Sequence, residues 1–316
     1  MKPSKRTVGV LMIGTMILNA CGAPAPGKDD VIRIGHLPIT HAAPLYFVKE
    51  FEDDLLSHGT IELVRFSSWI ELMDALNAGR IDGASVLFEL AMKAKERGID
   101  LSAVALGHRE GNAIVAAHEI TDPADLQGET VAIPHTLSAH HLLLDEMLRD
   151  AGVAYEDVNI VEMPPPEMPA ALSEGRIASY IVAEPFGALG VTLDAGHVLY
   201  QSDQFCPGSC LCCALVLRDD FMEEAPELSD AFLTAYLEAG VMADAMTEEA
   251  MAAHQNHLNV NEETLSLSLA WIDYGDLSIG EAEYEHLRSR LIEMALSDEP
   301  PAFDDFVDQS AFEEGR

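Results

Sequence analysis

The stretch Val31-Ile-Arg-Ile-Gly35 opens a series of short apolar runs that decides the fold, and Ile61-Glu-Leu-Val-Arg-Phe66 and Ile81-Asp-Gly-Ala-Ser-Val86 continue it. Each run has the composition of a buried strand, and a stretch with helical periodicity separates it from the next. The expected helices are Ala43–Leu56, Trp69–Asn77 and Glu89–Arg97. Strands that alternate with helices predict a parallel sheet with helices on both faces.

A second series of the same kind begins near Asp122. Its expected strands are Thr130–Ile133, Val158–Val161 and Ala178–Val182, and its expected helices are Ser138–Ala151 and Met168–Ser173. Further strands are expected at Leu101–Leu106, Ala113–Ala117, Val198–Ser202 and Ala214–Arg218, followed by helices to about Ser297. Two α/β series in 316 residues indicate two structural units.

The N-terminus has the composition of an export signal. Lys2, Lys5 and Arg6 precede an apolar stretch over residues 7–17, which is too short for the roughly 20 residues of a membrane-spanning helix. Leu18-Asn-Ala-Cys21 then has the form of a lipobox, in which the cysteine is acylated. We therefore expect a signal peptide at 1–20, a lipidated tether at 21–30, and a protein anchored on the extracytoplasmic face of the cell membrane.

The overall charge excludes one large class of partners. The chain has 54 acidic and 18 basic residues, a formal net charge of −36. A surface this acidic repels nucleic acid, so we expect no DNA or RNA partner. The hydrophobic fraction of 48% is that of a globular protein, and we expect disorder only in the tether and in a tail at 301–316.

Four cysteines lie close together beyond Cys21, in the stretch Cys206-Pro-Gly-Ser-Cys210-Leu-Cys212-Cys213. Cysteines outside the cytoplasm usually pair, which favours a disulfide within this stretch. A thiolate metal site formed by the four is the alternative, although the spacing is not a familiar zinc pattern. Free or ligand-contacting thiols are the third interpretation.

Two segments of the chain resemble one another, and they carry a family resemblance. Leu76-Asn-Ala-Gly-Arg-Ile-Asp-Gly-Ala84 and Leu172-Ser-Glu-Gly-Arg-Ile-Ala-Ser-Tyr180 each place a helix end, a glycine cap and a strand in the same order. Together with Asp125-Leu-Gln-Gly-Glu-Thr-Val-Ala-Ile-Pro134 and Ala183-Glu-Pro185, they resemble the nitrate/sulfonate/taurine/thiamine-precursor class of periplasmic binding proteins. This resemblance implies a type II periplasmic-binding-protein fold, with two Rossmann-like α/β lobes joined by two crossover segments. We expect lobe one at 31–117 plus 214–300 and lobe two at 118–213.

The resemblance also implies a function. It indicates a monomeric, non-enzymatic protein without a cofactor that closes on a small ligand and delivers it to the permease and ATPase subunits of an ABC importer. The expected ligand is a nitrate-, sulfonate- or bicarbonate-like anion or a small organic solute. One alternative is a metal or a metal complex, bound through His41, His141 and the cysteines. A more distant one is an enzyme similar to the thiamine-pyrimidine synthases, which share the fold.

The candidate ligand-binding residues follow from the geometry of such sheets. Ligands of open α/β sheets lie beyond the carboxyl ends of the strands, near helix N-termini. This rule, together with the cysteine cluster beside the return strand, selects Thr40, His41, Ser68, Trp69, Phe88, Thr136, Ser138, His141, Glu184, Cys212 and Cys213.

Overall fold

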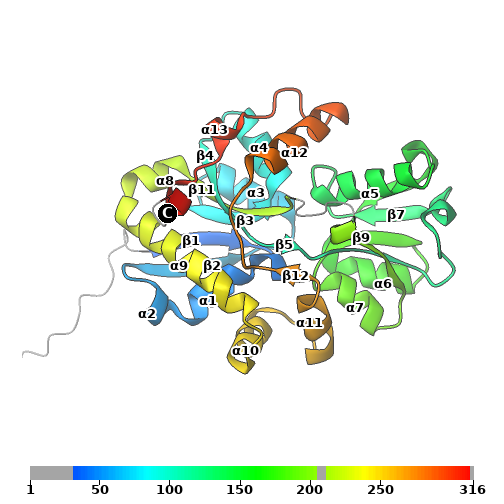
Figure 1. Ribbon diagram of the computed structural model, residues 1–316, viewed down its shortest axis with the longest axis horizontal. Helices are drawn as coiled ribbons and strands as arrows, with labels where there is room; N and C mark the ends of the chain where they lie inside the picture. The colour runs from blue at the N-terminus through cyan, green and yellow to red at the C-terminus, as the bar shows by residue number, and fades with distance from the viewer. Residues whose placement is uncertain (1–30, 205–210, 314–316) are drawn as a thin grey trace, which may run out of the picture.

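The computed structural model describes residues 31–204 and 211–313, which form two α/β lobes side by side (Figure 1). The sheet of lobe one has the strand order β2-β1-β3-β11-β4, and the sheet of lobe two has the order β10-β6-β9-β7-β8. This is the predicted type II arrangement of two lobes. Within the described ranges, none of the helices combines the length and apolar character needed to span a bilayer.

Lobe one is built from the two ends of the described chain. Its strands are β1 (Val31–His36), β2 (Thr60–Arg65), β3 (Gly83–Leu87), β4 (Leu101–Leu106) and β11 (Cys213–Arg218). Its helices are η2 (Thr40–Ala42), α1 (Ala43–Glu50), α2 (Glu52–Leu55), α3 (Trp69–Asn77), α4 (Phe88–Glu96), α8 (Asp219–Glu224), α9 (Pro226–Asp244), α10 (Glu248–His257), α11 (Glu262–Leu269), α12 (Glu281–Glu293), α13 (Phe303–Phe306) and α14 (Ser310–Glu313). Strand β11 runs antiparallel to both of its neighbours, β3 and β4.

Lobe two is formed by one continuous part of the chain. Its strands are β6 (Asn112–Ala116), β7 (Thr130–Ile133), β8 (Asn159–Glu162), β9 (Ser179–Ala183) and β10 (His197–Gln201). Its helices are η3 (Pro123–Leu126), α5 (Ala139–Asp150), η4 (Tyr155–Asp157), η5 (Pro165–Glu167), α6 (Met168–Ser173), α7 (Phe186–Thr192) and η6 (Ser202–Gln204). A small sheet of β5 (Arg109–Glu110) and β12 (Ile272–Asp273) lies at the junction of the lobes.

The paired glycines of the two related segments cap helices as predicted. Gly79 and Gly175 follow α3 and α6 with φ of 64° and 67°, a left-handed conformation in which a Cβ is strained. Each lets the chain turn directly from the helix into the next strand of its own lobe.

The first crossover lies earlier than expected. We placed it near Ala117, at the end of lobe one, but β6 pairs with β9 and β10 and so belongs to lobe two. The first crossover is therefore residues 107–111. The apolar run 113–117 was correctly predicted to form a strand, but its composition does not specify the sheet that the strand joins. The second crossover leads into β11 at Cys213, close to the expected position.

Within the C-terminal segment, residues 301–313 are also ordered, contrary to our expectation of a disordered tail at 301–316. Phe306 is 1% exposed, and Val307 forms a parallel bridge with Ala103 of β4. Phe306 packs on Phe88 and Tyr284, with ring centroids 5.7 and 6.3 Å away. The aromatic residues dock this segment on lobe one in spite of its acidic composition.

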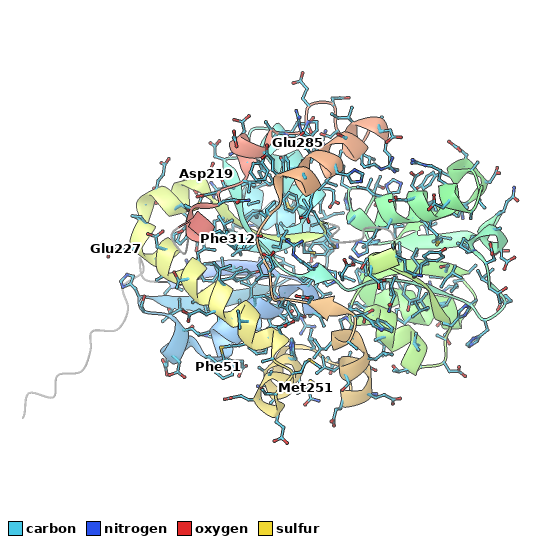
Figure 2. The ribbon with its side chains drawn as sticks, in the orientation of Figure 1. Phe51, Asp219, Glu227, Met251, Glu285 and Phe312 are labelled. Carbon is cyan, nitrogen blue, oxygen red and sulfur yellow. The ribbon has the colours of Figure 1, made fainter. Side chains whose placement is uncertain are left out.

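The outer surface of the molecule carries the acidic side chains that give the chain its charge. Glu227, for example, projects outward from α9 in Figure 2.

The larger of the two hydrophobic clusters extends from lobe one to β6, β9, α6 and α7, whereas the smaller cluster lies within lobe two. The two lobes thus share buried surface at their junction.

Candidate functional site

Two histidines and two cysteines meet beneath the junction of the lobes. His41 lies in η2 after β1, His108 follows β4 in the first crossover, and Cys212 and Cys213 lie where the second crossover enters β11. All four are buried, with exposures of 0, 1, 1 and 0%. Cys212 and Cys213 carry free thiols.

The polar atoms of this cluster lie close together. His41 Nδ1 is 3.7 Å from Cys212 Sγ and 3.6 Å from Cys213 Sγ, and the two sulfurs are 3.9 Å apart. The rings of His41 and His108 have centroids 3.5 Å apart. One ligand atom from each of the four residues falls within 4.8 Å of the others.

The local backbone explains why these segments can approach each other. The amide of Gly107 donates to Cys213 O at 2.9 Å, and the amide of Phe88 donates to Cys212 O at 2.8 Å. A Cβ at Gly107 would collide with the carbonyl oxygen of His41, so the absence of a side chain there permits the contact. Tyr274 holds η2 in place by donating its hydroxyl to Thr40 O at 2.9 Å.

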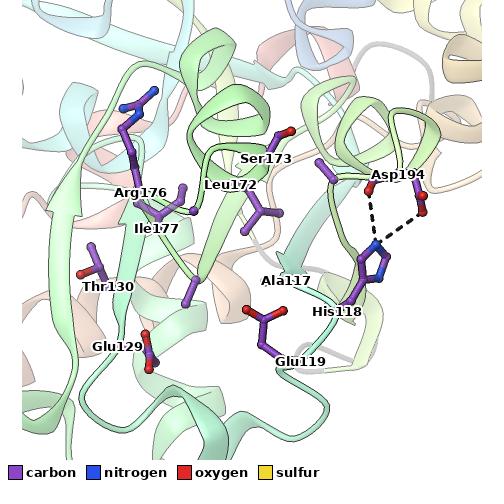
Figure 3. A pocket seen from close by; sticks show the side chains of 13 residues that line it. Ala117, His118, Glu119, Glu129, Thr130, Leu172, Ser173, Arg176, Ile177 and Asp194 are labelled. Carbon is purple, nitrogen blue, oxygen red and sulfur yellow. Dashed lines mark hydrogen bonds and ion pairs between the residues drawn. The ribbon is translucent and has the colours of Figure 1, made fainter.

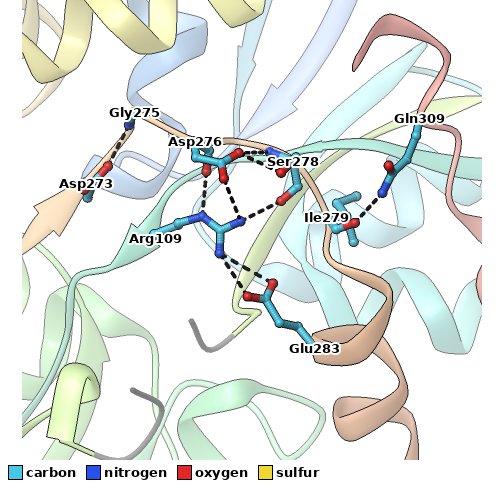
Figure 4. Close-up of polar contacts among 8 residues, drawn as sticks. All are labelled: Arg109, Asp273, Gly275, Asp276, Ser278, Ile279, Glu283 and Gln309. Atoms are coloured by element: carbon cyan, nitrogen blue, oxygen red, sulfur yellow. Dashed lines mark hydrogen bonds and ion pairs between the residues drawn. The ribbon is translucent and has the colours of Figure 1, made fainter. Parts of the chain in front are cut away.

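Arg109 fixes the first crossover to lobe one (Figure 4). Its guanidinium donates to Asp276 O at 2.7 Å and to Ser278 O at 2.8 Å, and it forms an ion pair with Glu283 at 3.4 Å. The neighbouring His108 is therefore held with lobe one. Glu110 and Gly111, which come next, have positive φ values of 57° and 75° and make the turn into β6.

Burial dominates the electrostatics of the cluster. It holds the pKa of His108 well below its usual value, and the neighbouring His41 lowers this pKa further. Burial likewise raises the pKa of the Cys212 thiol, and contact with Cys213 adds to the rise. At neutral pH His108 and Cys212 are therefore both uncharged.

Lobe two brings buried polar groups to the same junction. His140 on α5 is fully buried, and burial followed by the proximity of His41 lowers its pKa to about 3. Glu184 accepts hydrogen bonds at its backbone oxygen from the amide and the hydroxyl of Thr40, at 2.9 and 3.0 Å. Burial raises the pKa of the Glu184 carboxyl to about 8. Among the described residues, neither ring nitrogen of His140 has a hydrogen-bond partner.

One of the pockets lined by residues of both lobes lies at the carboxyl ends of β1 and β2. It has a volume of about 370 Å³ and is lined by Leu37, Pro38, Ile39, Arg65, Phe66, Ser67 and Glu71 of lobe one and by Pro165, Pro166 and Phe186 of lobe two. A second pocket, of about 460 Å³, is lined only by residues of lobe two, among them His118 and Arg176 (Figure 3). Only the first of these two lies between the lobes.

Ion pairs connect the lobes on their helical sides. Arg290 of α12 donates to Asp145 of α5 at 2.8 Å, and these side chains are 11% and 14% exposed. Asp145 also pairs with Arg149 of its own helix, and Arg290 pairs with Glu293 at 2.5 Å. Arg149 also reaches Glu293 of α12 at 3.8 Å, and the hydroxyls of Thr192 on α7 and Thr264 on α11 form a further contact between the lobes, at 2.7 Å.

The structure brings some of the predicted site residues together at the junction. Thr40, His41, Glu184, Cys212 and Cys213 meet there. Cys206 and Cys210, the other members of the predicted four-cysteine set, lie outside the described residues.

Other predicted residues serve the local structure of their own lobes. Ser68 and Ser138 cap α3 and α5 by accepting the amides of Glu71 and His141, both at 3.3 Å. Thr136 binds Glu162 through its hydroxyl, and His141 Nδ1 lies 2.7 Å from Thr136 O.

Two predicted aromatic residues are buried. Trp69, at the start of α3, is 4% exposed. Phe88 was expected in the cleft, but it packs on Tyr284 and Phe306 in the core of lobe one, because its position at the start of α4 faces that core.

The site also contains residues that sequence reasoning missed. His108 was not selected, although it follows β4 and the strand-end rule applies to it. Asn112 accepts the Cys212 thiol at 3.5 Å but lies in the apolar run of β6, where nothing in the pattern distinguishes it. Glu89 on α4 was also not selected; it is fully buried, burial raises its pKa to about 8, and none of the described residues hydrogen-bonds its carboxylate oxygens.

Known proteins resemble this chain over most of its length. The model of the NMT1-like family matches residues 25–256. A solved structure from Staphylococcus aureus, described as the ligand binding component of an ABC-type import system with zinc bound, is 40% identical. The match covers 91% of this chain and 99% of that chain, with a TM-score of 0.85.

Curated relatives include transport proteins of cyanobacteria. The nitrate/nitrite binding protein NrtA of Nostoc sp. is 26% identical over 82% of this chain and 65% of its own length. The nitrate import ATP-binding protein NrtC of Synechocystis sp. is 27% identical over 66% of this chain. The match spans only 34% of the length of NrtC.

Proposed function

The chain belongs to the NMT1-like family, and on this premise we propose that it is the lipid-anchored, extracytoplasmic substrate-binding component of an ABC importer. The Staphylococcus aureus protein, which matches over almost its whole length, is described as the ligand binding component of an ABC-type import system. The observation that carries the proposal is the pocket of about 370 Å³ lined by both lobes, because binding proteins of this kind hold their ligand between two lobes. The Staphylococcus aureus protein and NrtA are named as binding proteins, which supports a non-enzymatic role.

Closure of the lobes is the proposed mechanism. The two crossovers permit lobe two to swing about Glu110 and Gly111 while Arg109 stays attached to lobe one. A ligand that contacts both lobes stabilises the closed form by its differential affinity for that form. Arg65, Ser67 and Glu71 are the polar residues that lobe one brings to this pocket. Because the Ser67 hydroxyl donates to the Glu71 carboxylate at 2.7 Å, Arg65 is the group that can attract an anion there.

Native mass spectrometry of the protein purified from its own host would identify the ligand. Small-angle scattering with that ligand, and with nitrate, bicarbonate and taurine as probes, should show a smaller radius of gyration for the ligand that binds. Ligand at a hundredfold excess over its dissociation constant should also stabilise the fold by about 2.7 kcal/mol. Unchanged scattering with a ligand of proven affinity would refute closure.

The anchor is tested separately. Residues 1–30 lie outside the described part, so the lipobox ending at Cys21 rests on the sequence alone. We expect Cys21→Ser to release the protein from membranes or to leave the precursor uncleaved. A mutant of mature size that still fractionates with membranes would contradict the lipoprotein assignment.

A metal or metal complex as the delivered ligand is the second candidate function. The similar Staphylococcus aureus structure, which is described as having zinc bound, favours it. A delivered metal predicts that Zn²⁺ alone reduces the radius of gyration, whereas an anionic or organic cargo predicts closure with that solute.

A further inference from the structure

We propose that His41, His108, Cys212 and Cys213 bind one resident thiophilic divalent cation, best matched by Zn²⁺, which lobe one and the crossovers hold whether the lobes are open or closed. This site is distinct from the pocket between the lobes, since none of the four residues lines that pocket. The proposal does not depend on the identity of the transported solute.

The distances within the cluster fit a tetrahedral ion. With bonds of about 2.3 Å to sulfur and about 2.0–2.1 Å to nitrogen, a tetrahedron around Zn²⁺ places two sulfurs about 3.8 Å apart and a sulfur and a nitrogen about 3.5–3.6 Å apart. The separations between His41 Nδ1 and the two sulfurs are 3.7 and 3.6 Å, and the sulfurs are 3.9 Å apart. An ion therefore needs shifts of only a few tenths of an ångström in these three atoms. A disulfide would need the sulfurs at about 2.05 Å.

The chemistry of the donors also selects the ion. Two thiols and two imidazoles form the S₂N₂ set that suits zinc, whereas calcium and magnesium prefer oxygen ligands. Binding would form two metal–sulfur and two metal–nitrogen bonds and release the two thiol protons to solvent. The product is electrically neutral, two thiolates against a charge of +2, which suits a fully buried position.

The surroundings orient the donors toward one point. His41 Nε2 lies 2.8 Å from Gly111 O, so this nitrogen carries the proton and Nδ1 presents its lone pair to the sulfurs. Neither ring nitrogen of His108 has a hydrogen-bond partner in the described part of the chain, and a metal bond would satisfy one of them. The amide nitrogen of Asn112 also lacks a partner there, and with its amide rotated it would donate to the Cys212 thiolate.

Because of where the four donors lie in the fold, the ion stays bound when the lobes open and when they close. His41 is held with lobe one by η2, Cys213 is the first residue of β11, and His108 precedes the anchored Arg109. His41 and His108 lie before the turn at Glu110 and Gly111, and Cys213 begins β11. Cys212 comes directly before β11, and its carbonyl oxygen accepts the amide of Phe88 in lobe one, so a swing of lobe two removes none of the donors. A transported ion, in contrast, needs a donor that leaves when the lobes open.

The first experiment measures the metal in the mature chain. The protein is reduced, loaded anaerobically with ZnCl₂ and dialysed. We expect about one zinc per chain, and X-ray absorption at the zinc edge should report two sulfur and two nitrogen neighbours. If the chain retains no zinc, or if the absorption spectrum shows mostly oxygen atoms around the zinc, the proposal is wrong. Either result leaves the proposed import function untouched, because that function is tested with solute.

Variants then test the individual donors. Cys212→Ser and His108→Ala should each weaken zinc binding more than about a hundredfold, since even groups that only orient a ligand contribute 10- to 100-fold. His118→Ala is the matched control, because His118 is an exposed histidine of lobe two that binds Asp194. Equal zinc affinity in Cys212→Ser and in the control would exclude Cys212 as a ligand. If a variant does not fold, the absorption spectrum of Co²⁺ in the wild-type chain still reports thiolate coordination.

A separate experiment tests whether zinc binding is independent of the opening and closing of the lobes. We expect zinc loading to leave the radius of gyration unchanged, and an opened variant, Asp145→Asn, to bind zinc with the affinity of the wild type. Lobe closure on adding zinc, or zinc release on opening, would show that the ion is held by both lobes and would refute this part of the proposal.

Discussion

The ion pair between Arg290 and Asp145 should govern the balance between open and closed lobes. Asp145→Asn removes the carboxylate that accepts Arg290 Nη2 at 2.8 Å. A hydrogen bond to a charged group contributes about 1.5–3 kcal/mol, and little solvent screens this pair, because the side chains are only 11% and 14% exposed. Arg290 keeps Glu293 as a partner, so we expect a loss of about 1–2 kcal/mol. That loss shifts the ratio of closed to open lobes about 5- to 30-fold.

Small-angle scattering of the ligand-free protein measures this shift as an increase in the radius of gyration. Asp219→Asn is the matched control, because it breaks a partly buried ion pair with Lys95 entirely within lobe one. The control should lower the free energy of unfolding without changing the scattering profile. If Asp145→Asn behaves like the control, the pair stabilises the fold and has no role in closure.

Three further substitutions test buried contacts. Glu89 is buried with its pKa raised from 4.5 to about 8, so its contribution to stability is complete below pH 4.5 and is lost as the pH rises toward 8, at up to about 1.4 kcal/mol per pH unit. Glu89→Gln should flatten this fall in urea unfolding between pH 5 and 8, and equal slopes in both proteins would contradict the buried neutral carboxyl. Phe306→Ala should cost about 3–5 kcal/mol in the same assay, because the ring is 1% exposed; no loss would mean that the C-terminal segment does not dock. Thr40→Val removes the hydroxyl donor to Glu184 O and should weaken the contact between the lobes by about 1 kcal/mol, seen as a small opening in scattering, whereas an unchanged profile would count against that contact.

The sequence predicted the two lobes because each strand–helix unit carries a local signal of periodicity and glycine caps. It did not predict the sheet that β6 joins, since an apolar run does not specify its partner strand. The order of the C-terminal segment was missed for a related reason. Its acidic composition suggested disorder, and the surface on which its two aromatic residues pack is formed by distant parts of the chain.

The cluster was predicted in part. Cys212 and Cys213 were conspicuous by their spacing, and His41 by its place after β1. His108 is a single histidine after a strand. Only the fold shows that the first crossover brings its ring into contact with the ring of His41, with centroids 3.5 Å apart. Such a site is assembled from segments that are distant in sequence, so no local motif encodes it.

The insertion of β11 between β3 and β4 affects the order in which the two lobes can fold. Cys213 pairs with Leu87, and Arg218 pairs with Leu101, so lobe one depends on contacts of high sequence separation, which are slow to form. Lobe two contains only the strands from β6 to β10, which are contiguous in the chain, and it can nucleate by itself. During synthesis the first hundred residues therefore cannot complete a domain. Their sheet stays incomplete until the ribosome has made β11.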